Sequence, residues 1–152
     1  AIAELQMFME YFPESKRKTE AQLMIFGLQD KLVMKDYLTA KLYYDLGTYT
    51  GNASYTADMR INGNNFLACI TTAQNALKDY PYTSMREDIS ILLLRAKHKL
   101  GSESVLEKKE ERMRETIDEY YAFKNEFPES KYMKEVEAIY KDASKYVKEL
   151  NE

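Results

Sequence analysis

The chain has 152 residues, of which 31% are charged and 45% hydrophobic. This balance excludes a disordered tail, and the length is enough to bury a core without disulfide or zinc staples. Because 25 acidic residues are interspersed with 22 basic ones, the chain lacks the concentrated Lys and Arg of a nucleic-acid-binding protein. Five glycines and three prolines are too few for the turns of a sheet-rich fold, so the composition favours helices.

Seven helices are predicted wherever apolar residues recur at spacings of three and four. In chain order they cover 1–12, 16–33, 36–47, 64–80, 85–100, 105–127 and 131–150. The segment between the third and fourth helices, 48–63, is rich in Gly, Asn, Ser and Thr and has no apolar period. It is predicted to be an inserted loop within one helical domain spanning residues 1–152.

The three prolines mark an internal repeat. Apolar or small residues lie twelve, eight and five positions before each proline, which places them on one helical stripe. Because proline cannot continue a helix, each stripe is predicted to end just before it. The three stripes are Ala1, Leu5 and Phe8 before Pro13, Cys69, Ala73 and Ala76 before Pro81, and Thr116, Tyr120 and Phe123 before Pro128.

Hydroxyl side chains are predicted to cap the helices that follow. Ser15, Ser84 and Ser130 come shortly after the three prolines, and Ser84 with Glu87 has the spacing of a capping box. Ser104 with Glu107 is predicted to form a second box at the start of the sixth helix.

A stripe of this kind before a proline is similar to the second helix of a tetratricopeptide repeat. Ala40, Tyr43 and Gly47, in the segment AKLYYDLG, resemble the first helix of the same repeat. Antiparallel helix pairs cannot bury their stripes alone, so they are expected to stack side by side. The predicted fold is therefore an all-α, tetratricopeptide-like superhelix of about seven antiparallel helices, with one concave and one convex face.

Four segments in order resemble the BamD (YfiO) family of outer-membrane assembly lipoproteins. They are AKLYYDLG, NNFLACITTAQNALKDYPYT, ILLLRAKHKL and EYYAFKNEFPESKYMKEVEAIYKDA. The chain starts at Ala1 within a helical pattern, so we expect a fragment holding the C-terminal repeats of a longer lipoprotein. Two departures are the missing N-terminal lipid-bearing cysteine and the long segment 48–63.

The resemblance implies a non-catalytic scaffold in the outer-membrane β-barrel assembly machinery of Gram-negative bacteria. Its implied partners are the POTRA domains of BamA, other lipoproteins of the machinery, and unfolded outer-membrane protein clients. It also implies a place on the periplasmic face of the outer membrane, held by an N-terminal lipid that this fragment lacks. No cofactor and no nucleic acid are implied. The alternatives are a generic tetratricopeptide adaptor that captures a peptide tail in its concave groove, and an accessory domain of an enzyme.

The residues that might carry chemistry have simpler structural explanations. His98 lies in a Lys-rich helix end, where a cation interacts favourably with the helix dipole, and zinc sites need several ligands. Cys69 occupies a small-residue position of its stripe, which predicts a packed thiol. The acidic residues of 107–119 alternate with Lys and Arg as on a solvated face. We therefore predict no catalytic, metal-binding or cofactor-binding residues.

Thirteen tyrosines make protein recognition a stronger expectation, because Tyr combines a large contact area with a polar tip. Tyr43, Tyr120 and Tyr140 are predicted to be core residues, and Tyr11, Tyr80 and Phe127 to pack the turns. The predicted interaction residues lie beside the stripes and are Tyr44, Tyr82, Arg86, Arg95 and Tyr121.

Arg86 is the main candidate, because a helix start favours an acidic residue there. The alternative is that Arg86 pairs with the neighbouring Glu87 or Asp88. If Arg86 is an interaction residue, Arg86→Glu should weaken POTRA binding without changing helical content.

Overall fold

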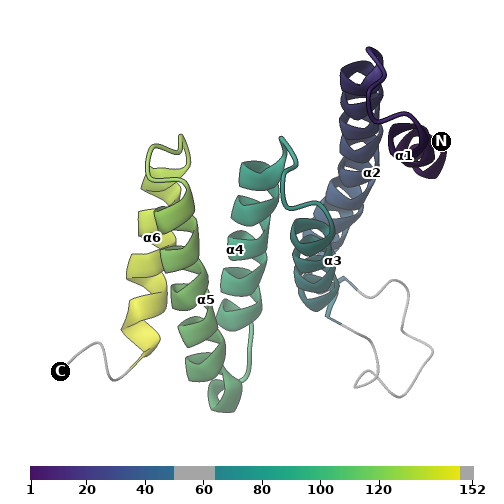
Figure 1. The fold of residues 1–152 in the computed structure, drawn as a ribbon. Helices are drawn as coiled ribbons and strands as arrows, with labels where there is room; N and C mark the ends of the chain where they lie inside the picture. The colour runs from purple at the N-terminus through teal and green to yellow at the C-terminus, as the bar shows by residue number, and fades with distance from the viewer. Residues whose placement is uncertain (50–63, 148–152) are drawn as a thin grey trace, which may run out of the picture.

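The computed structural model describes residues 1–49 and 64–147, and this part of the chain is helical without strands. Most of the predicted inserted loop and the end of the predicted last helix lie outside the described residues. The elements are α1 (Ile2–Tyr11), α2 (Lys18–Leu46), α3 (Asn65–Asp79), α4 (Arg86–Ser102), α5 (Leu106–Glu126), α6 (Met133–Ala143) and a 3₁₀ turn, η2 (Ser144–Tyr146) (Figure 1). The predicted all-α class is confirmed.

The prediction of two separate helices at 16–33 and 36–47 is wrong, because α2 runs unbroken from Lys18 to Leu46. No Gly or Pro lies near the expected break, and Met34 and Lys35 are good helix formers. Val33 and Ala40, seven residues apart, are both fully buried on one face of the helix. The described part of the chain therefore has six α-helices.

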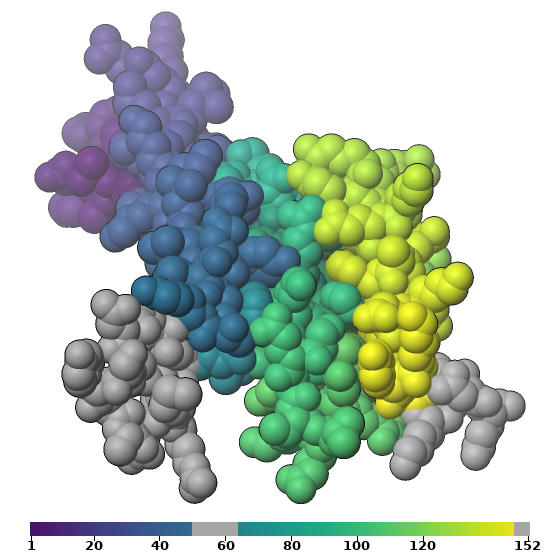
Figure 2. Space-filling model, turned by 180° about the vertical axis from the view of Figure 1, so that it is seen from behind, coloured from purple at the N-terminus to yellow at the C-terminus, as the bar shows by residue number. Residues whose placement is uncertain are grey.

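The helices pack in series. Each helix contacts the next one in the chain, from α1 on α2 to α5 on α6 (Figure 1). In addition, α4 contacts both α2 and α6, whereas no comparable packing joins α3 to α5 within the described residues. Helices α2, α4 and α6 therefore lie together on one side of the molecule, which we call the α2–α4–α6 face. The view from behind shows the same progression from the N-terminal to the C-terminal helices (Figure 2).

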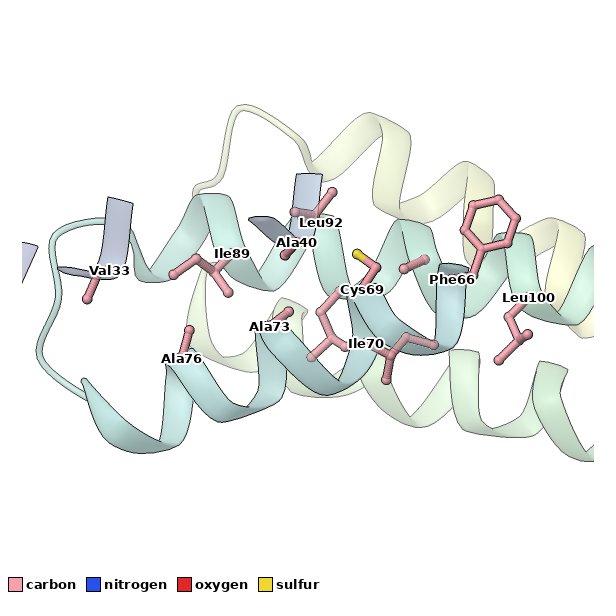
Figure 3. Close-up of a cluster of buried hydrophobic side chains, with 12 residues drawn as sticks. Val33, Ala40, Phe66, Cys69, Ile70, Ala73, Ala76, Ile89, Leu92 and Leu100 are labelled. Atoms are coloured by element: carbon pink, nitrogen blue, oxygen red, sulfur yellow. The ribbon is translucent and has the colours of Figure 1, made fainter. Parts of the chain in front are cut away.

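Helix α4 is buried on two sides and separates two core clusters. In the first core cluster, Ile89 and Leu92 pack with Val33 of α2 and with Cys69 and Ala73 of α3 (Figure 3). The second core cluster joins the other side of α4 to α5 and α6, and consists of Ile91, Leu94, Tyr120, Phe123, Val136 and Ile139. The predicted stripes before Pro81 and Pro128 are confirmed as core. Double-sided burial explains the continuous apolar run Ile91–Leu94 in α4.

The stripe before Pro13 is packed less completely. Helix α1 has no buried residue, and Leu5 and Phe8 are only half-buried. Tyr11 is 71% exposed, so its predicted turn-packing role is wrong, whereas Tyr80 and Phe127 do pack against the core clusters. None of the described helices combines the length and apolarity needed to cross a membrane.

The turns after the prolines share one hydrogen bond. The hydroxyl two residues after each proline accepts from the backbone amide two residues further on: Ser15 from Arg17, Thr83 from Met85 and Ser130 from Tyr132. None of α2, α4 and α6 has a side-chain cap, so the capping roles predicted for Ser15, Ser84 and Ser130 are wrong. The hydroxyls of Ser15, Thr83 and Ser130 instead close the turn before each helix.

The two predicted capping boxes are not formed. Glu87 accepts a hydrogen bond from Ser130, and Ser104 donates to the carbonyl of Leu100 at the end of α4. Helix α5 begins after Val105 without a side-chain cap. The carboxylate of Glu87 therefore binds the α5–α6 turn and does not cap α4. The hydroxyl of Ser104 binds the preceding helix and does not cap α5.

Candidate protein-interaction site

Arg86, the main candidate, lies at the start of α4 and is held within the molecule. Its guanidinium forms an ion pair with Glu126 at the end of α5. One guanidinium nitrogen also lies 3.3 Å from the carbonyl oxygen of Pro81. The predicted pairing with Glu87 or Asp88 is wrong, because residues one or two apart in a helix do not face each other. Both carboxylates instead accept hydrogen bonds from the α5–α6 turn.

Arg95 lies nine residues, about two and a half turns, further along α4 and reaches across to α6. Its Nε and Nη2 atoms donate to the two carboxylate oxygens of Glu135, each at 2.7 Å, in a bidentate pair. Its guanidinium carbon also lies 5.4 Å from the centroid of the Tyr132 ring. The hydrogen bond from Arg95 lowers the pKa of Glu135, so this carboxylate is charged at neutral pH.

Tyr44 comes from the C-terminal half of α2 and reaches the same face. Its ring is half-buried and meets Phe66 edge-on at 5.7 Å between centroids. Burial raises the pKa of Tyr44, and the positive charge of Arg95 opposes that rise. The structure thus brings Tyr44 and Arg95 together on the α2–α4–α6 face. Tyr44 packs against Phe66, and Arg95 is paired with Glu135.

A polar seam joins α4 to the α5–α6 turn and α6. Ser130 donates to Glu87 at 2.6 Å, and the Tyr132 hydroxyl donates to Asp88 at 3.1 Å. Further along, the Nε2 atom of His98 lies 2.9 Å from Asp142. We call these contacts, together with Arg95–Glu135, the α4–α6 seam. His98 is therefore a seam residue, with a specific carboxylate partner that the helix-end position did not indicate.

The seam should make the stability of the protein depend on pH in acid. Glu135 and Asp142 have folded-state pKa values below their ordinary values, because hydrogen bonds from Arg95 and from His98 respectively favour their charged forms. The unfolded chain therefore binds more protons below about pH 4, and stability falls as the pH drops through the folded pKa values. Since Glu135 is partly exposed, we expect its share to be below about 1 kcal/mol.

Urea unfolding at pH 7 and pH 3 measures this effect. Glu135→Gln should reduce the difference between the two pH values, whereas Glu137→Gln, an exposed carboxylate on the same helix, should leave it unchanged. An equal pH dependence in Glu135→Gln and in the unmodified protein would contradict the assignment.

The other two candidates lie elsewhere. Tyr82 projects from the α3–α4 turn and is 92% exposed. Tyr121 lies on α5, is 46% exposed, and its hydroxyl is 3.3 Å from that of Tyr140. The five predicted residues therefore occupy three places: Tyr82 and Arg86 at the α3–α4 turn, Tyr44 and Arg95 on the α2–α4–α6 face, and Tyr121 on α5.

The remaining candidate chemistry has structural roles. Cys69 is buried in the first core cluster, and burial raises the pKa of its thiol to about 12, so the thiol stays protonated at neutral pH. Lys97 of α4 forms a largely buried ion pair with Glu119 of α5 at 2.6 Å. In residues 1–49 and 64–147, no three His, Cys, Asp or Glu side chains are grouped as metal ligands.

A cavity at the α3–α4 turn was not predicted. It has a volume of about 230 Å³ and lies between α2 and the turn. Its lining residues are Phe26, Gln29, Asp30, Asp79, Tyr80, Pro81, Tyr82, Thr83 and Ser84. One sequence signal pointed to it, since an acidic residue and an aromatic residue precede both Pro81 and Pro128. The contribution of Asp30 from α2 has no such signal.

No family model matches the chain, and no curated protein matches it.

Proposed function

We propose that this chain is a non-catalytic scaffold of the outer-membrane β-barrel assembly machinery, similar to the BamD family. Its partners would be the POTRA domains of BamA, other lipoproteins of the machinery and unfolded outer-membrane protein clients. The working place would be the periplasmic face of the outer membrane, with a lipid anchor in the full-length protein. The four segments that carry the resemblance support this proposal, because they fall in order on α2, α3, α4 and the α5–α6 pair.

The observation that carries the proposal is the common geometry of the three proline turns. In each turn the hydroxyl at the second position after the proline accepts from the amide two residues later. Such repetition supports a tetratricopeptide-like superhelix in which α2 and α3, then α4 and α5, are successive helix pairs and α6 begins the next. Stacked repeats offer extended surfaces for other proteins, which is the role of a scaffold.

Two features favour docking at the turn edge over capture of a peptide tail in the groove. On the α2–α4–α6 face, Arg95 pairs with Glu135, and Lys41 pairs with Asp45 at 2.7 Å. A peptide would have to compete with these intramolecular pairs. At the α3–α4 turn, by contrast, Tyr82 is almost fully exposed, and aromatic residues are enriched at interfaces.

A titration of the 152-residue chain with purified BamA POTRA domains tests the proposal. We expect saturable binding, and we expect Arg86→Glu to weaken it by about tenfold or more, equivalent to about 1.4 kcal/mol, with an unchanged far-ultraviolet circular dichroism spectrum. Lys108→Glu, an exposed reversal at the start of α5, serves as the charge control. Absence of binding by the unmodified chain would refute the proposed partner.

A second variant separates direct contact from an indirect effect. Arg86→Glu combined with Glu126→Arg restores the intramolecular pair with reversed polarity. If Arg86 contacts the POTRA domains, the double variant stays weak; if Arg86 acts only by holding Glu126, the double variant recovers affinity.

A further inference from the structure

The α3–α4 and α5–α6 turns are built alike. Each begins with an acidic residue, an aromatic residue and proline: Asp79, Tyr80 and Pro81 in one, and Glu126, Phe127 and Pro128 in the other. In each, the hydroxyl two residues after the proline donates to a carboxylate on an earlier helix. Thr83 donates to Asp30 of α2 at 3.1 Å, and Ser130 donates to Glu87 of α4 at 2.6 Å.

The two turns differ in what the acidic residue before the aromatic residue binds. At the α5–α6 turn, Glu126 holds the guanidinium of Arg86 through both carboxylate oxygens. At the α3–α4 turn, neither Asp79 nor Asp30 forms an ion pair with any residue in the described ranges. The acidic residue before the aromatic residue therefore has a cationic partner at the α5–α6 turn, but none among the described residues at the α3–α4 turn.

The cavity beside Asp79 has the chemistry to hold such a cation. Asp30 and Asp79 both line it, and its lining contains no Lys, Arg or His. Three aromatic side chains complete the wall, and two of them are substantially exposed: Phe26 at 47% and Tyr82 at 92%. A cation is attracted both by carboxylates and by the faces of aromatic rings, so these walls favour the same kind of ligand.

We propose that this cavity is a docking site for an arginine side chain presented by a partner protein. The incoming guanidinium would bind Asp79 as Arg86 binds Glu126, and its plane would lie against the ring of Phe26 or Tyr82. Arginine fits better than lysine, because its planar fork can bind a carboxylate bidentately while stacking on an aromatic ring. The proposal concerns the chemistry of the ligand and holds whether or not the partner is a POTRA domain.

N-acetyl-arginine amide is a suitable probe in a nuclear magnetic resonance titration of the ¹⁵N-labelled chain. We expect saturable shifts of the backbone amides of Tyr82, Thr83 and Ser84, with a Kd of about 1–10 mM, corresponding to a small ligand of low affinity. N-acetyl-lysine amide should bind more weakly, and N-acetyl-glutamine amide, which is uncharged, should give no saturable shifts.

Three variants sharpen this titration. Asp79→Asn should weaken binding of the arginine probe at least about fivefold, the equivalent of about 1 kcal/mol. Glu129→Gln, an exposed carboxylate in the α5–α6 turn, should leave the affinity at the α3–α4 turn unchanged. Arg86→Gln should vacate Glu126 and add a second set of saturable shifts around Ser130.

Each variant is used after its spectrum shows the dispersion of the unmodified protein. Saturable shifts at Tyr82 that are equal in Asp79→Asn, or that N-acetyl-glutamine amide produces equally, overturn the proposal. Shifts that remain linear in probe concentration up to about 50 mM, well above the expected Kd range, also overturn it.

Discussion

Replacing Phe123 by alanine should lower the free energy of unfolding by about 3–5 kcal/mol. Phe123 is fully buried in the second core cluster, and its ring lies 5.2 Å from that of Phe127. The loss combines the transfer of apolar surface out of water with the cavity that the truncation leaves. Because α4, α5 and α6 meet in this cluster, we expect the variant also to loosen the α4–α6 seam.

Chemical denaturation followed by circular dichroism measures this effect. Asn125→Ala, at an exposed position two residues further along α5, should change stability by no more than about 0.5 kcal/mol. A loss below about 1 kcal/mol for Phe123→Ala would mean that the second core cluster is not packed as described.

The sequence predicted best the features that depend on local pattern. Cys69, Ala73 and Ala76 share a helical stripe that ends at a proline, and all three are buried in α3. The break expected after Val33 is wrong, because no Gly or Pro lies there to end the helix. Packing of Val33 and Ala40 on the same face favours one continuous α2 instead.

The candidate site was predicted less well, because its contacts join residues far apart in the chain. Arg86 is identified by its place at a helix start and Arg95 by its place beside a stripe, yet their partners Glu126 and Glu135 lie 40 residues further on. Helical spacing predicts pairs only at three and four residues. Which of many acidic residues faces each arginine depends on how the helices stack, which the sequence pattern does not specify.

The cavity at the α3–α4 turn shows the same limit. The repeated acidic, aromatic and proline residues indicate two equivalent turns. They do not indicate that Arg86 binds the acidic residue of the α5–α6 turn. That difference depends on Arg86, which comes from α4 and reaches the end of α5. Only the stacking of α4 on α5 shows that Glu126 has a cationic partner, whereas Asp79 has no ion-pair partner among residues 1–49 and 64–147.

Replacing Gly47 by alanine should destabilise the protein by about 1–3 kcal/mol. Gly47 ends α2 with φ 53° and ψ −117°, a combination that a residue with a side chain adopts only under strain. An added Cβ would also lie 3.1 Å from the Cζ atom of Phe66. The strain is difficult to relieve, because the Gly47 amide donates to Tyr43 at the end of α2 and its carbonyl accepts from Asn65 at the start of α3.

Gly27 provides a matched control with the opposite sign. It lies within the same helix, and a Cβ added there would meet no atom within 4 Å. Because alanine is the better helix former, Gly27→Ala should raise stability by about 0.5–1 kcal/mol. Thermal unfolding of both variants compares them directly. Destabilisation by Gly27→Ala would contradict the open helical environment of Gly27, and no destabilisation by Gly47→Ala would contradict the close approach of α2 to α3.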